Sequence, residues 1–464
     1  MKKLIGPICQ ILTLDQLPLK GALRDEQLEI LTQAGILIEG EFIQKVGAWA
    51  ELKQEFPEAE IHELDGDYVA LPGMVDCHTH LCFGGSRARD FALRNAGKTY
   101  LEIAAAGGGI WDTVTQTRSL DQETLAEITV HNANRLLSEG ITSIEVKSGY
   151  GLSLAEELKM LRAIKQASAD TAADLIPTCL AAHLCPKDWK GSSSEYLTEI
   201  TDQLFPVLLA ENLCSRIDAF VEKSAFSPEE ITPYLERAKQ LGFDLTIHAD
   251  QFSCGGSTVA VRLGARSADH LEASGTPEIL ALASSNTVAV ALPGASIGLG
   301  MAFTPARKLL DQGACLAIAS DWNPGSAPMG DLLAQASILA TFEKLSTAEV
   351  LAGITFRAAA ALGLPDRGKL TKGQLADFIL FPTSDYREIL YQQGKMKPVG
   401  VGKKGEKWRN KGQEIRNKRL DSMVIQPKSC FSALASWFLF LASYFLLLGS
   451  CILFLASRLL SLAS

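Results

Sequence analysis

The sequence predicts an α/β protein, in which a (β/α)8 TIM-like barrel is joined to a small β-sandwich domain. Three observations support this fold class. Between about residues 72 and 360, short apolar runs alternate with amphipathic segments, as they do in parallel βα units. Five of the seven histidines lie at or just after the ends of such runs, the face at which barrels carry their chemistry. Strand-like sequence flanks the region on both sides.

The expected barrel strands are apolar runs that end in Gly, His, Asp or Glu. They occupy residues 141–146, 175–182, 217–221, 243–247, 287–292 and 315–319. Residues 154–167 and 228–241 have the alternation of polar and apolar positions that is typical of surface helices. A doubly wound open sheet is the structural alternative, but no Gly-x-Gly-x-x-Gly motif follows an early strand to favour it.

The smaller domain is predicted from sequence outside the barrel. Residues 1–70 read as short strands around glycine turns, and residues 373–382 read as a strand that returns to the same sheet. We therefore expect residues 1–70 and 361–408 to form the β-sandwich domain and residues 71–360 to form the barrel. Residues 409–464 would be a basic linker and an apolar tail.

Charge and cysteine content limit the classes of function. The chain of 464 residues has a net charge of −9, which argues against nucleic acid as its main partner. The first residues lack the long apolar stretch of a secretory signal, and ten cysteines are scattered without paired spacing. Both features predict a reducing, cytoplasmic location.

The C-terminal tail does not fit this picture. Residues 430–457 contain no charged side chain, a length and composition that meet the criterion for a membrane-spanning helix. Residues 403–419 hold eight basic and two acidic side chains, which would keep the main body on the cytoplasmic side. Repeated Leu-Ala-Ser units make a nonfunctional appendage the alternative to a membrane anchor.

The most informative motif is Asp76-Cys77-His78-Thr79-His80, which closes an apolar run. Side chains alternate along a strand, so the two histidines point the same way, about 6.6 Å apart along the strand. Two converging imidazoles supply two of the ligands that a catalytic metal needs.

Further strand-end residues complete a candidate metal site. His78, His80 and His248 can offer neutral imidazole nitrogens, and Asp321 can be an anionic ligand. The ion would lower the pKa of a bound water, and Asp321 could accept the proton of that water. His270 has two interpretations: it stabilises a developing oxyanion, or it is a hydrogen-bonded core histidine.

At these residues the chain resembles the amidohydrolase superfamily and, within it, the imidazolonepropionase family. The similarity lies within residues 1–408. The matching segments are Leu71-Pro-Gly-Met-Val-Asp-Cys-His-Thr-His-Leu-Cys-Phe-Gly-Gly-Ser-Arg, Glu145-Val-Lys-Ser-Gly-Tyr-Gly-Leu, Ala182-His, Ile247-His-Ala-Asp-Gln, Ser267-Ala-Asp-His-Leu-Glu, Leu292-Pro-Gly and Ser320-Asp-Trp-Asn-Pro-Gly-Ser.

The resemblance implies hydrolytic ring opening of 4-imidazolone-5-propanoate to N-formimidoyl-L-glutamate in histidine degradation. It implies one Zn²⁺ or Fe³⁺ per subunit, held by His78, His80, His248 and Asp321, in a homodimer. Asp321, His270 and Gln251 would be the catalytic residues. The substrate-binding residues would be Arg87, which grips the propanoate, Tyr150, His183 and Gln251 around the ring, and Asn323, Gly325 and Ser326 around the product.

Some relatives carry Glu where this chain has Gln251, which would leave water activation to Asp321 and His270. Three other interpretations stay open. Lys147 could be carbamylated in a binuclear site with His183 and His270. The chain could be an aminohydrolase acting on cytosine- or guanine-like bases, although Arg87 favours a substrate with a carboxylate. It could also be an inactive, membrane-tethered homologue.

Overall fold

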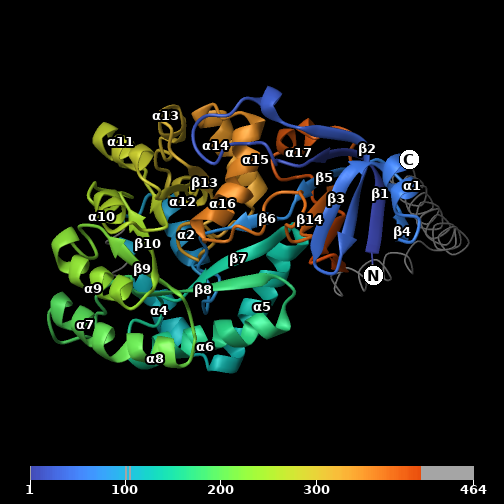
Figure 1. Cartoon of the computed structure of the whole chain (residues 1–464). Helices are drawn as coiled ribbons and strands as arrows, with labels where there is room; N and C mark the ends of the chain where they lie inside the picture. The colour runs from blue at the N-terminus through green and yellow to red at the C-terminus, as the bar shows by residue number, and fades with distance from the viewer. Residues whose placement is uncertain (1, 100–101, 104–105, 409–464) are drawn as a thin grey trace, which may run out of the picture. The chain divides into compact units, whose positions relative to one another are not determined.

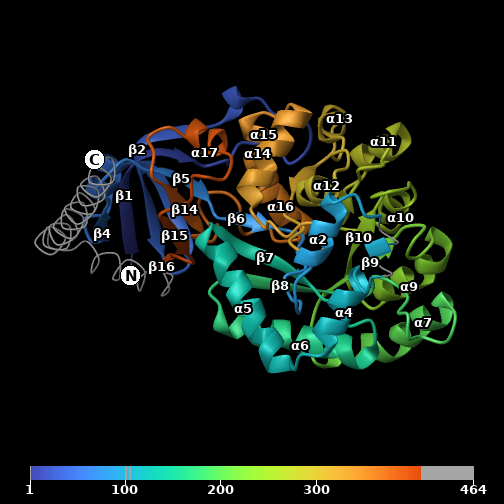
Figure 2. The same ribbon diagram turned by 180° about the vertical axis from the view of Figure 1, so that it is seen from behind.

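The computed structural model describes residues 2–99, 102–103 and 106–408. Within this part of the chain, the strands form two eight-stranded sheets. One is an all-parallel sheet from the middle of the chain, and the other is a mixed sheet that combines strands from before and after it (Figure 1). Seen from behind, the helices wrap the outside of the parallel sheet (Figure 2).

The parallel sheet confirms the predicted (β/α)8 barrel, because its strands pair in strict chain order. They are β6 (Met74–Asp76), β7 (Ile141–Lys147), β8 (Asp174–Ala182), β9 (Arg216–Val221), β10 (Asp244–Ala249), β11 (Ser267–His270), β12 (Val288–Ala291) and β13 (Leu316–Ile318). Every residue of β7 and β12 is buried, as expected for strands covered on both faces.

The barrel closes just beyond the ends of β6 and β13, not through a regular ladder between these two strands. Thr79 and Trp322 form an isolated parallel bridge. The amide of Asp321 donates to the carbonyl of His78 at 3.0 Å, and the amide of Ser320 donates to Asp76 Oδ1 at 3.0 Å across 244 residues of sequence. The closing seam therefore joins the two segments that carry the His-x-His motif and Asp321.

Helices connect successive strands and lie outside the barrel. They are α2 (Ala88–Asn95), α4 (Ile110–Arg118), α5 (Gln122–Ser138), α6 (Leu154–Asp170), α7 (Ser193–Glu199), the π-helix η2 (Ile200–Leu204), α8 (Phe205–Ala210), α9 (Pro228–Gln240), α10 (Gly256–Leu263), α11 (Thr276–Ser284), α12 (Pro293–Leu299), α13 (Ala306–Asp311), α14 (Leu332–Glu343), α15 (Thr347–Gly353) and α16 (Phe356–Ala361). Ser227 directly precedes helix α9, and its side chain accepts a hydrogen bond from the amide of Glu230, as the sequence signature suggests. Helices α6 and α9 lie where the amphipathic segments predicted them.

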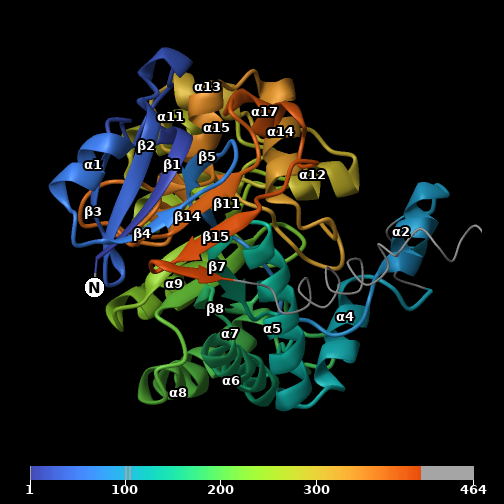
Figure 3. The same ribbon diagram turned by 90° about the vertical axis from the view of Figure 1, so that its right-hand side faces the viewer.

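The mixed sheet has the order β16-β15-β14-β5-β1-β2-β3, with β4 paired to β1. Its elements, with two short helices and the turn η1 (Asp25–Gln27), are β1 (Lys2–Leu12), β2 (Ile30–Glu39), β3 (Phe42–Ala48), α1 (Trp49–Glu55), β4 (Glu60–Glu63), β5 (Val69–Pro72), β14 (Phe378–Phe381), α17 (Arg387–Tyr391), β15 (Gly400–Lys403) and β16 (Glu406–Trp408). Strand β14 returns from beyond the barrel and pairs antiparallel with β5 (Figure 3).

Gly73 links the two sheets, because it lies directly between β5 and β6. Its amide donates to the carbonyl of Asp377 at 2.9 Å. A Cβ atom at this position would lie 2.4 Å from Thr142 Oγ1, so only glycine fits the junction.

Among the described residues, no helix is both long enough and apolar enough to cross a membrane. The predicted apolar tail at 430–457, and the basic linker from residue 409 onward, lie outside the described residues.

Candidate metal centre

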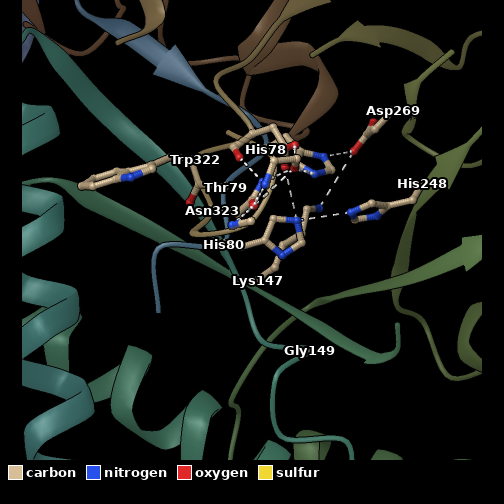
Figure 4. A network of polar contacts seen from close by, with 12 residues as sticks. His78, Thr79, His80, Lys147, Gly149, His248, Asp269, Trp322 and Asn323 are labelled. Atoms are coloured by element: carbon tan, nitrogen blue, oxygen red, sulfur yellow. Dashed lines mark hydrogen bonds and ion pairs between the residues drawn. The ribbon is translucent and has the colours of Figure 1, made fainter. Parts of the chain in front are cut away.

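Three histidine side chains converge at the carboxyl end of the barrel strands (Figure 4). His78 and His80 follow β6, and His248 lies on β10. One nitrogen of each lies within 4.8 Å of the others, and His80 Nε2 is 3.3 Å from His248 Nε2. The three residues are 0–3% exposed, so their rings lie in the protein interior.

Asp321 joins this cluster from beyond β13. Its Oδ1 atom is 3.5 Å from His78 Nε2 and 3.5 Å from His80 Nε2. The backbone of Asp321 has φ +50°, a left-handed conformation that a side-chain-bearing residue adopts at a cost. Burial raises the pKa of its carboxyl to about 6. The closing seam imposes this conformation and aims the carboxylate at the histidines.

The four groups fit a single metal ion. Ligands about 2.1 Å from a tetrahedral ion are about 3.4 Å apart, close to the 3.3 and 3.5 Å separations observed. His78 Nε2 is buried and has no hydrogen-bond partner, which is costly unless a ligand occupies the space in front of it. Burial lowers the pKa of His78 and His80 well below the usual range and that of His248 to about 3, so all three are neutral donors.

Two aspartates orient two of these histidines. Asp269 Oδ2 lies 2.6 Å from His78 Nδ1, and Asp218 Oδ2 lies 2.9 Å from His248 Nδ1. Asp269 holds the proton on Nδ1 of His78 and leaves Nε2 free to bind a metal, a pairing common at metal sites, and Asp218 lies close enough to His248 Nδ1 to act in the same way. Neither aspartate was predicted from the sequence. Each is a charged residue inside a buried strand, and this sequence feature could have identified both of them.

Lys147 lies beneath the histidines and joins the carboxylates (Figure 4). Its Nζ is 2.7 Å from Glu145 Oε2, 2.8 Å from Asp218 Oδ2 and 3.9 Å from Asp269 Oδ2. Burial opposes the charge of Lys147, but Asp218, Glu145 and Asp269 raise its pKa above the usual value. The side chain is therefore an ammonium, whereas carbamylation requires a neutral amine.

His270 ends β11 and lies behind the metal cluster. Its ring centroid is 5.8 Å from that of His78 and 5.3 Å from that of His248. Burial alone would lower the pKa of His270, but Glu272, whose carboxylate is 3.5 Å from Nδ1, raises it. A φ of +83° gives His270 a strained backbone like that of Asp321. The ring can thus carry a proton close to the cluster.

Tyr150 and His183 form the wall beside His80. The ring centroid of His80 is 5.9 Å from that of Tyr150 and 5.6 Å from that of His183, and the two histidine rings are stacked. His183 Nδ1 contacts the Gly149 carbonyl at 2.9 Å, which leaves Nε2 free to meet a ligand.

Burial lowers the pKa of His183 to about 4. An unfolded histidine has a pKa of about 6.5, so the stabilisation is complete above that pH and is lost as the pH falls toward 4. When the pH is lowered from about 8 to about 5, proton uptake by His183 in the unfolded state should reduce the free energy of unfolding by about 2 kcal/mol. Urea titrations should show that His183→Gln removes this part of the acid sensitivity, whereas exposed His131→Gln retains it. Equal acid sensitivity in His183→Gln and the wild type would contradict the assignment.

Arg87 reaches the site from the loop before α2. Its Nε pairs with Asp90, and Nη1 donates to Thr113 Oγ1 at 3.4 Å. A Cβ on Gly325 would lie 3.5 Å from Arg87 Nη1, so the guanidinium faces the loop that follows Asp321. Arg94, which was not predicted from the sequence, donates to the Gly325 carbonyl at 3.2 Å. The two loops therefore meet beside the cluster.

The loop after Asp321 is held by Asn323. Its Oδ1 accepts from the amides of Gly325 and Ser326 at 2.8 Å each, while its Nδ2 donates to the Asp321 carbonyl at 2.7 Å. Ser326 Oγ lies 3.4 Å from Asp321 Oδ2. The predicted product-binding residues thus form one compact turn that also supports the carboxylate of Asp321.

Gln251 is buried on the loop after β10. The next residues of this loop are fixed by Glu222, which sequence reasoning also missed. Its Oε2 accepts from the amides of Phe252 and Ser253, each at 3.0 Å. Gln251 is therefore carried by an anchored backbone.

Comparisons with known proteins agree with this geometry. The Amidohydrolase family model matches residues 69–407. The imidazolonepropionase of Bdellovibrio bacteriovorus is 40% identical over 412 residues, 87% of this chain and 96% of the relative. That of Erwinia tasmaniensis is 41% identical over 380 residues, 81% of this chain and 93% of the relative.

Solved structures share the fold at lower identity. Atrazine chlorohydrolase from Arthrobacter aurescens, complexed with zinc, matches with a TM-score of 0.67 and 17% identity over 90% of this chain and 99% of that chain. An adenosine deaminase from Xanthomonas campestris with bound zinc has a TM-score of 0.64 and 18% identity, covering 90% of this chain and 97% of that one. The family match and the sequence relatives together establish that this chain belongs to the amidohydrolase family, among the imidazolonepropionases.

Proposed function

We propose that the protein hydrolyses 4-imidazolone-5-propanoate to N-formimidoyl-L-glutamate, the ring-opening step of histidine degradation. The observation that carries the proposal is the convergence of His78, His80, His248 and Asp321 next to the Arg87 loop. The imidazolonepropionases at 40–41% identity over more than four fifths of the chain support the choice of substrate.

One metal ion per subunit would be held by the Nε2 atoms of His78, His80 and His248 and by Oδ1 of Asp321. Bound there, the ion supplies a water of lowered pKa and a positive charge beside the substrate carbonyl. Imidazole and carboxylate ligands suit both zinc and iron, so we propose Zn²⁺ or Fe³⁺.

Asp321 moves the proton in the reaction. As the water oxygen bonds to the ring carbonyl carbon, the Asp321 carboxylate takes the proton that this water releases. It returns the proton to the ring nitrogen as the carbon–nitrogen bond breaks. A carboxylate next to both the water and the ring nitrogen can accept and then donate this proton.

His270 stabilises the tetrahedral oxyanion. Its pKa is raised by Glu272, so the ring can donate a charged hydrogen bond to the oxygen on which negative charge develops. Gln251, Tyr150 and His183 would position the ring, and the turn of Asn323, Gly325 and Ser326 would hold the polar groups of the product.

Arg87 would bind the propanoate carboxylate, because Asp90 holds its Nε while Nη1 reaches Thr113 and the turn that follows Asp321. Charge-assisted hydrogen bonds contribute about 1.5–3 kcal/mol, so Arg87→Met should lower kcat/KM by roughly 10- to 150-fold, chiefly through KM. Steady-state kinetics measure the change. Exposed Arg89→Met, two residues away, is the matched control and should behave as wild type. A wild-type KM in Arg87→Met would contradict the role.

The binuclear alternative is disfavoured by the buried contacts of Lys147, whose ammonium is surrounded by carboxylates. Within the described part of the chain, His78, His80 and His248 form the one group with metal-ligand spacing. Metal analysis separates the two interpretations: two ions per chain would support the binuclear site, and one ion supports the present proposal.

The direct test is an assay of the purified protein on 4-imidazolone-5-propanoate, with metal analysis of the same sample. Turnover to N-formimidoyl-L-glutamate with one bound ion supports the function. Metal binding without turnover, both in the full chain and in a version ending at residue 410, would favour the inactive homologue. Deamination of cytosine or guanine instead would favour the aminohydrolase.

We also propose that the protein is a cytoplasmic homodimer. Its partner is the small-molecule substrate, and it binds no nucleic acid. The eight cysteines of the described residues are free thiols, in keeping with a reducing compartment. Light scattering of the purified chain measures the oligomeric state.

A further inference from the structure

A buried ion-pair cluster lies directly beneath the proposed metal site, and Lys147 is at its centre. The ammonium contacts Glu145 at 2.7 Å and Asp218 at 2.8 Å, and it lies 3.9 Å from Asp269. All four side chains are fully buried. A buried lysine of this kind is stable only if its charge is matched by nearby carboxylates.

Two of these carboxylates also hold the histidines. Asp218 contacts His248 Nδ1, and Asp269 contacts His78 Nδ1, so each aspartate lies between the ammonium and one imidazole. We infer that Lys147 is a positioning residue for the metal centre, because it holds Asp218 and Asp269 where they orient His248 and His78. This inference rests on the proposed metal site.

The other contacts of this ion-pair cluster show why the positive charge of Lys147 is needed. Asp269 accepts a hydrogen bond from Thr246, and Glu145 accepts one from Thr178. Arg216, a second cation, lies 3.8 Å from Glu145. Without the ammonium, three carboxylates would face one another in a water-free interior. Their mutual repulsion would turn Asp218 and Asp269 away from the histidines.

A second buried lysine provides a matched control. Lys403 bridges Asp174 and Asp377 at 2.8 and 2.6 Å between the two sheets, but neither aspartate contacts a histidine. Loss of Lys403 breaks two short ion pairs of a buried lysine, one of them to an aspartate that is 27% exposed, so it should lower stability without affecting the metal site.

The experiment measures Zn²⁺ affinity of the full chain by equilibrium competition with a chelator, for the wild type, Lys147→Met and Lys403→Met. Loss of contacts that orient metal ligands typically costs 10- to 100-fold in affinity, so we expect Lys147→Met to bind zinc on the order of 10- to 100-fold more weakly. Lys403→Met should bind as the wild type does. Unchanged zinc affinity in Lys147→Met, or an equal loss in Lys403→Met, would overturn the inference.

Lys147→Met combined with Glu145→Gln separates positioning from folding. It removes one positive and one negative charge, so the net buried charge stays the same. If positioning is the role of Lys147, zinc affinity remains low although the protein folds, as circular dichroism of the metal-free form would show. Wild-type affinity in this double variant would refute the role. A wild type that binds no zinc or iron would instead refute the proposed metal centre.

Discussion

Replacement of Asp321 by asparagine is expected to lower kcat by on the order of a thousandfold, because the amide can neither accept the proton of the attacking water nor return it to the leaving nitrogen. The side chain keeps its size, and the amide of residue 321 keeps its bond to the His78 carbonyl at the closing seam. The variant should therefore fold, with thermal unfolding near that of the wild type.

Kinetics and metal content measured on the same preparation test this expectation. The three histidines should retain part of the metal, so the loss of kcat should exceed the loss of bound ion. Asp244→Asn is a suitable control, because Asp244 forms an exposed ion pair with Arg266 and should leave kcat unchanged. A variant at position 321 with more than a tenth of wild-type kcat would show that another group carries the proton.

Removal of the metal is the second large effect. Prolonged dialysis against a chelator should abolish turnover, and one equivalent of Zn²⁺ or Fe³⁺ per chain should restore it. The same step should lower thermal stability, because a ligand at a thousandfold excess over its Kd stabilises the folded state by about 4 kcal/mol.

Hydrogen exchange of the metal-free protein should show which segments the bound ion stabilises. His78, His80 and Asp321 lie on both sides of the closing seam, so hydrogen exchange should accelerate at residues 78–80 and 320–322 before it does in β9. Full turnover after complete metal removal would contradict the proposed mechanism altogether.

The barrel could be predicted from sequence because most of its strands are continuous apolar runs that end in polar residues. Strand β11 (Ser267–His270) is the instructive exception. It is buried, but two of its four residues are charged or titratable, so hydrophobic pattern alone does not distinguish it from a loop. Asp269 and His270 are tolerated there because they face the site, where other polar groups contact them.

The metal ligands could be predicted because each stands at a strand end. The residues that orient them could not. His78 and Asp269 are 191 residues apart, and Arg94 is 231 residues from Gly325. Contacts over such separations cannot be predicted from the spacing of residues in the sequence. Charged residues within buried strands, such as Lys147 and Asp218, indicate buried ion pairs. Only the closed barrel determines which of these residues pair with one another.

The seam between β6 and β13 has a consequence for biosynthesis. Asp76 and Ser320, which meet there, are 244 residues apart, so at 5–20 residues per second the ribosome needs on the order of 10–50 s to travel from one to the other. During that interval the nascent chain presents two histidines without their carboxylate partner. Tight metal uptake must therefore await synthesis of the segment around residue 321, more than two thirds of the way along the 464-residue chain.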